Sequence, residues 1–234
     1  MIVLALCLLT AQQELQIAAA SDLSAVSKAL AAGFEKEVPG VRVRFTNAAS
    51  GILAKQIENG APFDVFLSAN EKFVMDLSKS GRLEGFSVRQ YAVGQLGMWS
   101  AKGQYQTLED LLRPEVKHVA IANPKLAPYG AAAREALDKV WQRIATKIVY
   151  GENVRQALQY AETGNADVVL TSWALLYAKS PPAVRLPANL HQPIRQSGGI
   201  VKGSKQAKLA ERFLVFLTKG KGAEILRSSG FETP

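Results

Sequence analysis

Short apolar segments alternate with amphipathic segments along most of this 234-residue chain, and this alternation constrains the fold more than any other feature. Residues 15–19 have the pattern of a buried strand, and the apolar residues from Leu23 to Phe34 recur at helical spacing on a helix that begins near Ser21. The same order of strand and helix is repeated over residues 41–57 and over residues 64–77. Such a βαβαβα series favours a parallel sheet flanked by helices.

A longer apolar segment, residues 91–100, follows this series and predicts a strand that crosses to a second lobe. Strand and helix patterns then alternate again, and residues 194–201 predict a second crossing. We therefore predict an α/β protein of two lobes, each a mostly parallel sheet flanked by helices, joined by two hinge crossings. The first lobe comprises residues 12–90 and 200–234, and the second comprises residues 91–199. A single larger α/β domain is the alternative.

Residues 1–11 form the only continuous apolar run of the chain, and they are too short to span a bilayer. They resemble the apolar region of a signal peptide that is cleaved after Ala11, which predicts export to the periplasm. The sole cysteine, Cys7, lies in a lipoprotein-like sequence, but Leu6 stands where a small residue is usual, so a lipid anchor is less favoured. The alternative is a buried first strand of a cytosolic protein. The abrupt change to the polar residues 12–14 argues against it.

The composition describes a globular protein with a basic surface. An apolar fraction of 48% is ample for a hydrophobic core. The formal net charge of +8 is also seen in nucleic-acid-binding modules, but the Lys and Arg residues are dispersed and form no stripe interleaved with aromatic residues. A solvated surface that attracts anions is the more economical interpretation. We expect no nucleic-acid partner.

The motifs of common enzyme classes are missing from the sequence. The two histidines, His118 and His191, have no His, Cys or carboxylate neighbours at metal-ligand spacing. The sequence contains no G-x-S-x-G elbow, Walker loop or G-x-G-x-x-G fingerprint, and the glycine-rich residues 198–203 favour a hinge or β-bulge. We therefore predict no catalytic residue, no cofactor and no metal bound directly by protein side chains. An enzyme on a two-lobed fold is the alternative, and it would need a base over the cleft.

Small or polar residues mark the points where predicted strands run into predicted helices. A helix start leaves backbone N–H groups without partners and carries the positive end of the helix dipole, so it suits an anion. Each junction alone is explained as an ordinary N-cap, but the set predicts a cage of donors for a small oxyanion. The junctions are Ala20-Ser21, Ala49-Ser50, Ser68-Ala69-Asn70, Pro128-Tyr129-Gly130 and Glu152-Asn153-Val154.

Several of these junctions lie in longer motifs that occur in a characteristic order. Together they resemble the periplasmic molybdate-binding proteins of ABC importers, and the match covers essentially the whole mature chain. This resemblance implies a two-lobed periplasmic binding protein fold of type II that closes over a tetrahedral oxyanion. The motifs are Ala18-Ala19-Ala20-Ser21, Ala49-Ser50-Gly51, residues 60–69 (GAPFDVFLSA), residues 123–130 (NPKLAPYG), Glu152-Asn153-Val154-Arg155 and Gly230-Phe231.

The resemblance also implies which residues bind the oxyanion. The hydroxyl groups of Ser21 and Ser50 would donate to it. Many relatives carry a tyrosine hydroxyl where this chain has Thr171, so Thr171 either donates a shorter-range bond or leaves its place to water. Asn70 and Asn153 are expected to be plain capping residues. The backbone N–H groups expected at the ligand are those of Ser21, Ser50, Ala69, Tyr129 and Val154.

The chemistry of the oxyanion agrees with a site of this kind. Molybdate and tungstate are fully deprotonated near neutral pH, so they accept hydrogen bonds and donate none. Hydrogen phosphate carries a proton, and a lining of donors would leave it unpaired at a cost of about 1–3 kcal/mol. Asp22 is expected to be a first-turn acid that points away from the site, and phosphate becomes a candidate if it faces the anion.

The resulting functional prediction is the substrate-binding component of an ABC importer. It would capture molybdate or tungstate and deliver it to the membrane permease. A binding protein for another oxyanion, such as sulfate or phosphate, is the alternative. A monomer is expected, since the protein would act as a diffusing shuttle.

Overall fold

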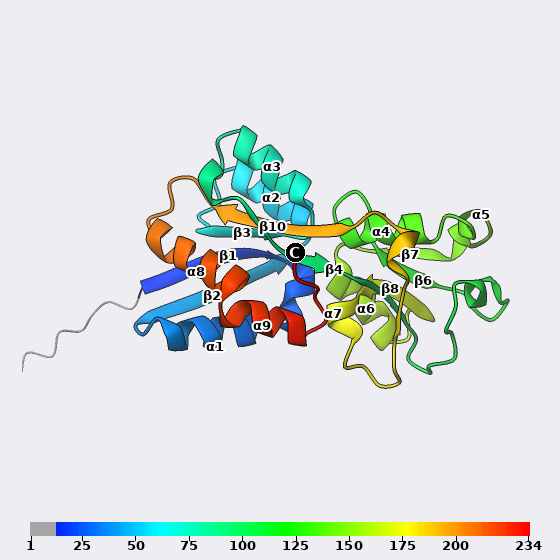
Figure 1. Cartoon of the computed structure of the whole chain (residues 1–234). Coiled ribbons are helices and arrows are strands. Elements are labelled where there is room, and N and C mark those ends of the chain that lie inside the picture. The colour runs from blue at the N-terminus through cyan, green and yellow to red at the C-terminus, as the bar shows by residue number, and fades with distance from the viewer. Residues whose placement is uncertain (1–12) are drawn as a thin grey trace, which may run out of the picture.

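The computed structural model describes residues 13–234, which form two lobes, each built around a five-stranded sheet (Figure 1). The predicted signal segment, residues 1–11, and the lipidation candidate Cys7 lie outside the described residues. Within residues 13–234, no helix is both long enough and apolar enough to cross a membrane. The two-lobed α/β arrangement confirms the predicted fold class.

The first lobe is a mixed sheet with the strand order β2-β1-β3-β10-β4. Its first three strands are parallel, as the βαβ pattern predicts, and β10 is antiparallel to both β3 and β4. Its helices begin at the carboxyl ends of the parallel strands or return from the end of the chain. The strands are β1 (Gln13–Ala20), β2 (Val41–Ala48), β3 (Val65–Ser68), β4 (Arg89–Gly94) and β10 (Ile194–Ile200); the helices are η1 (Ser21–Ala25), α1 (Ser27–Glu37), α2 (Ser50–Glu58), α3 (Glu71–Lys79), η2 (Gly85–Ser87), α8 (Ala207–Lys219) and α9 (Lys221–Ser228).

The second lobe repeats this plan with the strand order β7-β6-β8-β5-β9. Strands β6, β7 and β8 are parallel, while β5 is antiparallel to β8 and also pairs with the short β9. The strands are β5 (Leu96–Trp99), β6 (Val119–Ala122), β7 (Ile148–Gly151), β8 (Val168–Ser172) and β9 (Val184–Arg185); the helices are η3 (Glu109–Leu112), α4 (Pro128–Ala136), α5 (Trp141–Ile144), η4 (Ala145–Lys147), α6 (Val154–Glu162), α7 (Trp173–Leu176) and η5 (Ala188–Leu190).

The two crossings lie a few residues from their predicted positions. The chain enters the second lobe at Gln95, between β4 and β5, and returns just before Ile194. Strands β4 and β10 therefore belong to the first sheet, although most of their residues were assigned to the second lobe. The reason is that residues 91–100 are mostly apolar on both sides of Gln95, because the strands before and after the crossing are largely buried in their own sheets. Hydropathy alone does not show where one sheet ends and the next begins.

The helix expected to begin at Ser21 is divided in two. Residues Ser21–Ala25 form the 3₁₀ helix η1, and the α-helix α1 begins only at Ser27. The break falls at Val26, whose amide donates to the carbonyl of Leu23 at 2.9 Å, an i to i−3 bond that tightens the turn. The apolar residues on both pieces still face the same core, so the stripe was identified correctly but not the helix type.

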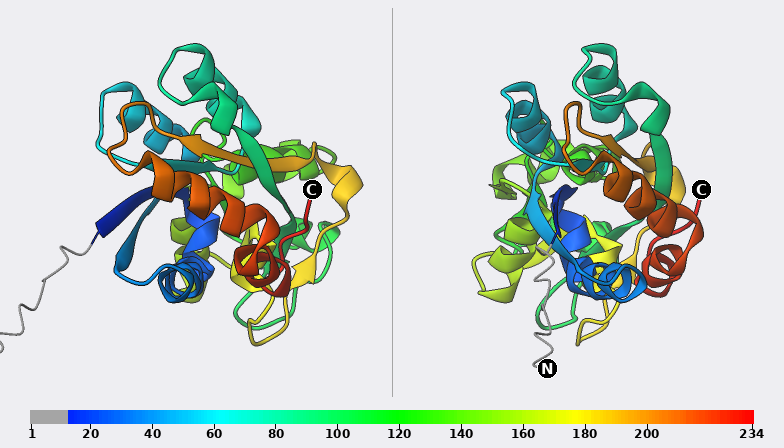
Figure 2. Two further views of the ribbon diagram at one scale, coloured as in Figure 1. Left: turned by 60° about the vertical axis from the view of Figure 1, so that its left-hand side comes forward. Right: turned by 90° about the vertical axis from the view of Figure 1, so that its left-hand side faces the viewer.

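The core of the first lobe is closed by the two C-terminal helices. Figure 2 shows α8 and α9 beside α1, although about 170 residues separate these segments in sequence. Phe34 of α1 packs edge-to-face against Phe213 and Phe216 of α8, with ring centroids 5.1 and 5.5 Å apart. Such pairs contribute about 0.5–1.5 kcal/mol each beyond the area they bury. The carboxyl ends of β1 and β3 face the second lobe. Ligands of α/β proteins commonly bind at the carboxyl ends of the strands.

A donor-lined cavity between the lobes

A small cavity lies where the carboxyl ends of β1 and β3 meet the second lobe. Its volume is about 10 Å³, close to the space that one water molecule needs. Pockets for drug-sized ligands are roughly 300–1,000 Å³, so this cavity is far too small for an organic solute. Its lining residues come from both lobes: Ala20, Ser21, Asp22, Ala49, Ser50, Ala69, Ala127, Pro128, Tyr129 and Val154.

All but one of the residues predicted to bind the oxyanion line this cavity. Ser21, Ser50 and Ala69 come from the first lobe, and Tyr129 and Val154 from the second. All five are buried in the closed arrangement. The structure thus brings together positions that span more than half of the chain, and their contact with an anion remains a prediction.

Thr171 does not line the cavity. It is fully buried in β8, and its Oγ1 donates a 3.0 Å hydrogen bond to the backbone carbonyl of Val154. The hydroxyl group is therefore directed at the first residue of α6. Its influence on a ligand would be exerted through the position of Val154.

The helix starts around the cavity are capped in two different ways. Asn70 and Asn153 cap α3 and α6, because their side-chain oxygens accept hydrogen bonds from first-turn amides at 2.8 to 3.1 Å. This confirms the predicted capping roles. The N-cap residues of α2 and α4, in contrast, are Ala49 and Ala127, which have no side-chain acceptor. Alanine is one of the poorer N-caps, so these two helix starts lack the usual local partner for their amides.

The first-turn amides at the cavity are available to a ligand. Among residues 13–234, no hydrogen bond is formed by the backbone N–H groups of Ser50, Tyr129 or Val154. The amide of Ala69 donates to Ser50 Oγ at 3.1 Å. Leaving a buried donor unpaired costs about 1–3 kcal/mol, and a small oxyanion would supply acceptors to several donors at once.

No cationic side chain lines the cavity, and its only carboxyl group is that of Asp22. Asp22 lies in the first turn of η1, as predicted, and its Oδ2 accepts a 2.6 Å hydrogen bond from Nε2 of Gln196 on the crossing strand β10. The expectation that it points away from the site is wrong, because Asp22 lines the cavity, so the condition under which phosphate becomes a candidate ligand is met. Burial raises the pKa of Asp22 from 3.8 to about 6. Burial and the nearby Asp22 also hold the pKa of the Tyr129 phenol well above its usual value. Within the described residues, no group of three or more His, Cys, Asp or Glu side chains could hold a metal ion.

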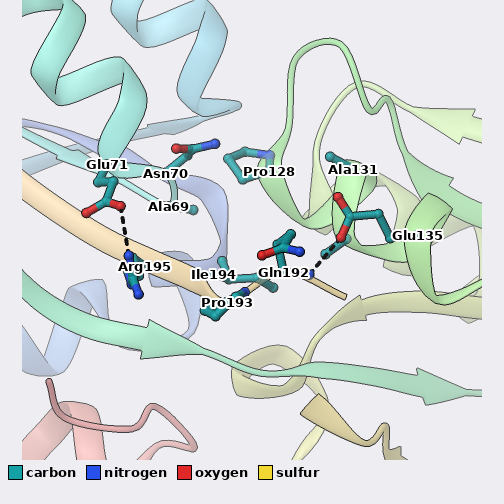
Figure 3. A pocket seen from close by; sticks show the side chains of 11 residues that line it. Ala69, Asn70, Glu71, Pro128, Ala131, Glu135, Gln192, Pro193, Ile194 and Arg195 are labelled. Carbon is teal, nitrogen blue, oxygen red and sulfur yellow. Dashed lines mark hydrogen bonds and ion pairs between the residues drawn. The ribbon is translucent and has the colours of Figure 1, made fainter. Parts of the chain in front are cut away.

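A second pocket adjoins the cavity on the outside and shares Ala69 and Pro128 with it (Figure 3). Its charged side chains are engaged with neighbouring groups. Arg195 pairs with Glu71 at 3.4 Å, and a Glu135 carboxylate oxygen accepts from the Gln192 amide at 2.7 Å. Because Arg195 is already paired and two carboxylates line the wall, this outer pocket is less suited to an anion than the inner cavity.

Gln196 was not identified from the sequence as part of this region. It lies in the glycine-rich crossing strand β10, two residues before the pair Gly198-Gly199. The available signal was a polar side chain within a strand flanked by Ile194 and Ile200, since a buried polar residue must find a partner.

Two α/β lobes, joined by two crossings and meeting at a small cavity lined by backbone amides, two serines and one carboxyl group, define a solute-binding protein of the two-lobed type. The sequence agrees with this class. Residues 15–232 match the family described as "Bacterial extracellular solute-binding protein", and the chain belongs to that family.

Individual relatives and solved structures are also similar to this chain. The chain is 36% identical to the molybdate-binding protein ModA of Azotobacter vinelandii over 226 residues, covering 93% of this chain and 89% of the relative. It is 30% identical to the putative ABC transporter substrate-binding lipoprotein YvgL of Bacillus subtilis, covering 93% and 85%. The solved periplasmic molybdate-binding protein of Azotobacter vinelandii superimposes with a TM-score of 0.86 at 31% identity, over 94% of this chain and 99% of that structure. This superposition confirms the predicted periplasmic binding protein fold.

Proposed function

We propose that this protein is the substrate-binding component of an ABC importer and that it captures molybdate or the closely similar tungstate. The observation that carries the proposal is the cavity itself. It is small, it is closed by both lobes, and the amides of Ser50, Tyr129 and Val154 have no partner among the described residues. The relatives named as molybdate-binding proteins support the choice of ligand.

The binding mechanism follows from the chemistry of the donors. A dianion with four oxygens would accept from the Ser21 and Ser50 hydroxyls and from the amides around them. Each hydrogen bond to a charged group contributes about 1.5–3 kcal/mol, and neutral donors avoid the desolvation of a full counter-charge. Because donors come from both lobes, the anion stabilises the closed arrangement over the open one.

The cellular setting is part of the same proposal. The ABC transporter name of one relative supports a membrane permease as the partner, and the apolar residues 1–11 support export to the periplasm. We propose a monomer that carries no cofactor, binds molybdenum only as its oxyanion, catalyses no reaction and has no nucleic-acid partner.

A thermal-shift titration with molybdate, tungstate, sulfate and phosphate tests the proposal. A ligand at a hundred times its Kd stabilises the folded state by about 2.7 kcal/mol, which raises Tm by roughly 5–10 °C for a chain of this size. Molybdate and tungstate should give this shift at micromolar concentrations, while sulfate and phosphate should not. A shift with sulfate or phosphate alone would replace the proposed ligand, and no shift with any of the four would contradict an oxyanion-binding role.

A further inference from the structure

Three buried polar side chains from different parts of the fold meet at the cavity, two of which, Asp22 and Tyr129, belong to residues that line it. Asp22 belongs to η1 of the first lobe, Gln196 to the crossing strand β10, and Tyr129 to α4 of the second lobe. Nε2 of Gln196 donates to Asp22 Oδ2 at 2.6 Å and to the Tyr129 hydroxyl oxygen at 3.0 Å. All three residues are at most 2% exposed. The side-chain amide of Gln196 thus connects the two lobes through its two hydrogens.

The other crossing strand makes room for this contact. Gly94 is the last residue of β4, and a Cβ atom at this position would lie 2.2 Å from the Tyr129 hydroxyl oxygen and 2.9 Å from Gln196 Nε2. Any side chain here would displace the Tyr129 ring or the Gln196 amide. Both crossing strands therefore contact the Tyr129 hydroxyl group, β4 through Gly94 and β10 through Gln196.

The backbone amide and the side-chain hydroxyl group of Tyr129 lie in different surroundings. Its backbone amide lies at the cavity, where it has no partner among the described residues, and its hydroxyl group lies in the buried cluster with Gln196. A single rigid ring connects these two ends. Fixing the hydroxyl group therefore fixes the position from which the amide reaches the cavity.

We propose that Asp22, Gln196 and Tyr129 form an interlobe clasp that holds the closed lobes in register and positions the Tyr129 amide at the bound anion. Asp22 and Gln196 are positioning residues in this arrangement and act on the ligand through Tyr129. The part of the inference that concerns the anion rests on the proposed function.

The substitution Tyr129→Phe tests the clasp because it removes the hydroxyl group and keeps the backbone amide. Tyr91→Phe is the matched control. Tyr91 is equally buried, but its hydroxyl group donates at 3.3 Å to the Ser68 carbonyl, which belongs to the same lobe. We expect Tyr129→Phe to weaken molybdate binding about tenfold in calorimetry, and Tyr91→Phe to change it less than twofold even where it lowers Tm.

Lobe closure is measured in the same proteins by energy transfer between dyes. Cysteines replace the exposed Lys79 of the first lobe and Lys139 of the second, in a mature chain that lacks Cys7. Tyr129→Phe should lower the closed fraction at a given molybdate concentration, and Tyr91→Phe should not. Tyr129→Phe protein that binds and closes like Tyr91→Phe protein would overturn the clasp.

A double-mutant cycle separates the clasp from a general loss of packing. If Gln196 and Tyr129 act as one unit, the double variant Gln196→Leu/Tyr129→Phe should bind no more weakly than Gln196→Leu alone. Losses in affinity that add independently would overturn the coupling. If the Gln196 variants do not fold, the comparison of Tyr129→Phe with Tyr91→Phe still decides the question.

Titration of the parent protein distinguishes failure of the clasp from failure of the proposed function. A parent that closes on sulfate or phosphate but not on molybdate loses its proposed ligand, and the clasp is then judged with the anion that closes it. A parent that closes on none of these anions contradicts both proposals.

Discussion

The backbone amide of Gly51 donates a 3.0 Å hydrogen bond to the carbonyl of Leu126, so the two lobes are bonded directly at the rim of the cavity. Gly51 lies in the first turn of α2, and Leu126 lies just before α4. The neighbouring amide, that of Ser50, has no partner among residues 13–234 and lies at the cavity. Consecutive amides of one helix turn thus serve different purposes, one holding the lobes together and the other being available to a ligand.

Gly51→Ala should weaken ligand binding by opposing closure. A Cβ atom at this position would lie 3.1 Å from the Leu126 carbonyl oxygen and 3.3 Å from the Phe73 ring, which is tighter than ordinary contact. We expect a three- to tenfold increase in Kd for molybdate, measured by calorimetry, because the added methyl group makes closure of the lobes less favourable. Gly85→Ala is the control, because a Cβ there would meet only Ser78 Oγ at 3.4 Å. Equal affinities for the two variants would show that this contact does not limit closure.

Ser21→Ala and Ser50→Ala should each reduce the free energy of anion binding by about 1.5–3 kcal/mol, the contribution of a hydrogen bond to a charged group. Ser24→Ala is a suitable control, since Ser24 lies on the same short helix as Ser21 but does not line the cavity. Calorimetric titration with molybdate measures all three variants. If Ser21→Ala and Ser50→Ala bind as tightly as the parent, these hydroxyls are not ligand donors.

Thr171→Val should affect folding more than binding. The Thr171 hydroxyl donates to the Val154 carbonyl, so its removal should lower the free energy of unfolding by about 1 kcal/mol. Its effect on molybdate affinity should be smaller than that of Ser21→Ala, because Thr171 does not line the cavity. Denaturant unfolding and calorimetry on one preparation give both quantities. A loss of affinity as large as that of Ser21→Ala would assign Thr171 the role of the tyrosine found in many relatives.

The stability of the protein, measured relative to Asp22→Asn protein, should rise in mild acid because the carboxyl of Asp22 is buried. Burial raises the pKa of Asp22 from 3.8 to about 6, so the folded state holds the proton more tightly than the unfolded state. Stability associated with this group is therefore highest below about pH 4, falls as pH rises to about 6, and stays low above it. The interval of about two pH units corresponds to about 3 kcal/mol.

Denaturant unfolding at pH 4 and pH 7 measures this contribution. Other carboxylates titrate alike in both proteins, so the parent's free energy of unfolding relative to that of Asp22→Asn should rise by up to about 3 kcal/mol on acidification. A difference that is the same at both pH values would show that the pKa of Asp22 is not raised.

Much of the fold could be predicted because buried strands and amphipathic helices leave regular patterns in sequence. The two lobes, the parallel order of β1 to β3, and the capping by Asn70 and Asn153 all depend on local residues. The positions of the crossings do not. The chain changes sheets at Gln95, inside a segment that is apolar on both sides, so no local pattern marks the change.

In the candidate site too, some features could be predicted from the local sequence and others could not. Residues at the strand-to-helix junctions were predictable, because small residues at a helix start indicate where the backbone is accessible. The contacts of Gln196 and Gly94 were not, because each depends on residues far away in the sequence: Gln196 reaches Asp22 across 174 positions. Thr171 was predicted to be near the ligand on resemblance alone, and its actual partner, the Val154 carbonyl, is a backbone group that side-chain patterns do not reveal.

The alanine N-caps of α2 and α4 have a consequence for the lifetime of the protein. Ala49 and Ala127 provide no side-chain cap, which is typically worth about 1 kcal/mol per helix, so on the proposed function a bound anion would act as the missing cap of both helices at once. The empty protein then opens more readily, and proteases act on opened states. Scarcity of the anion would shorten the survival of its own carrier, so the amount of intact protein would follow the supply of the solute it collects.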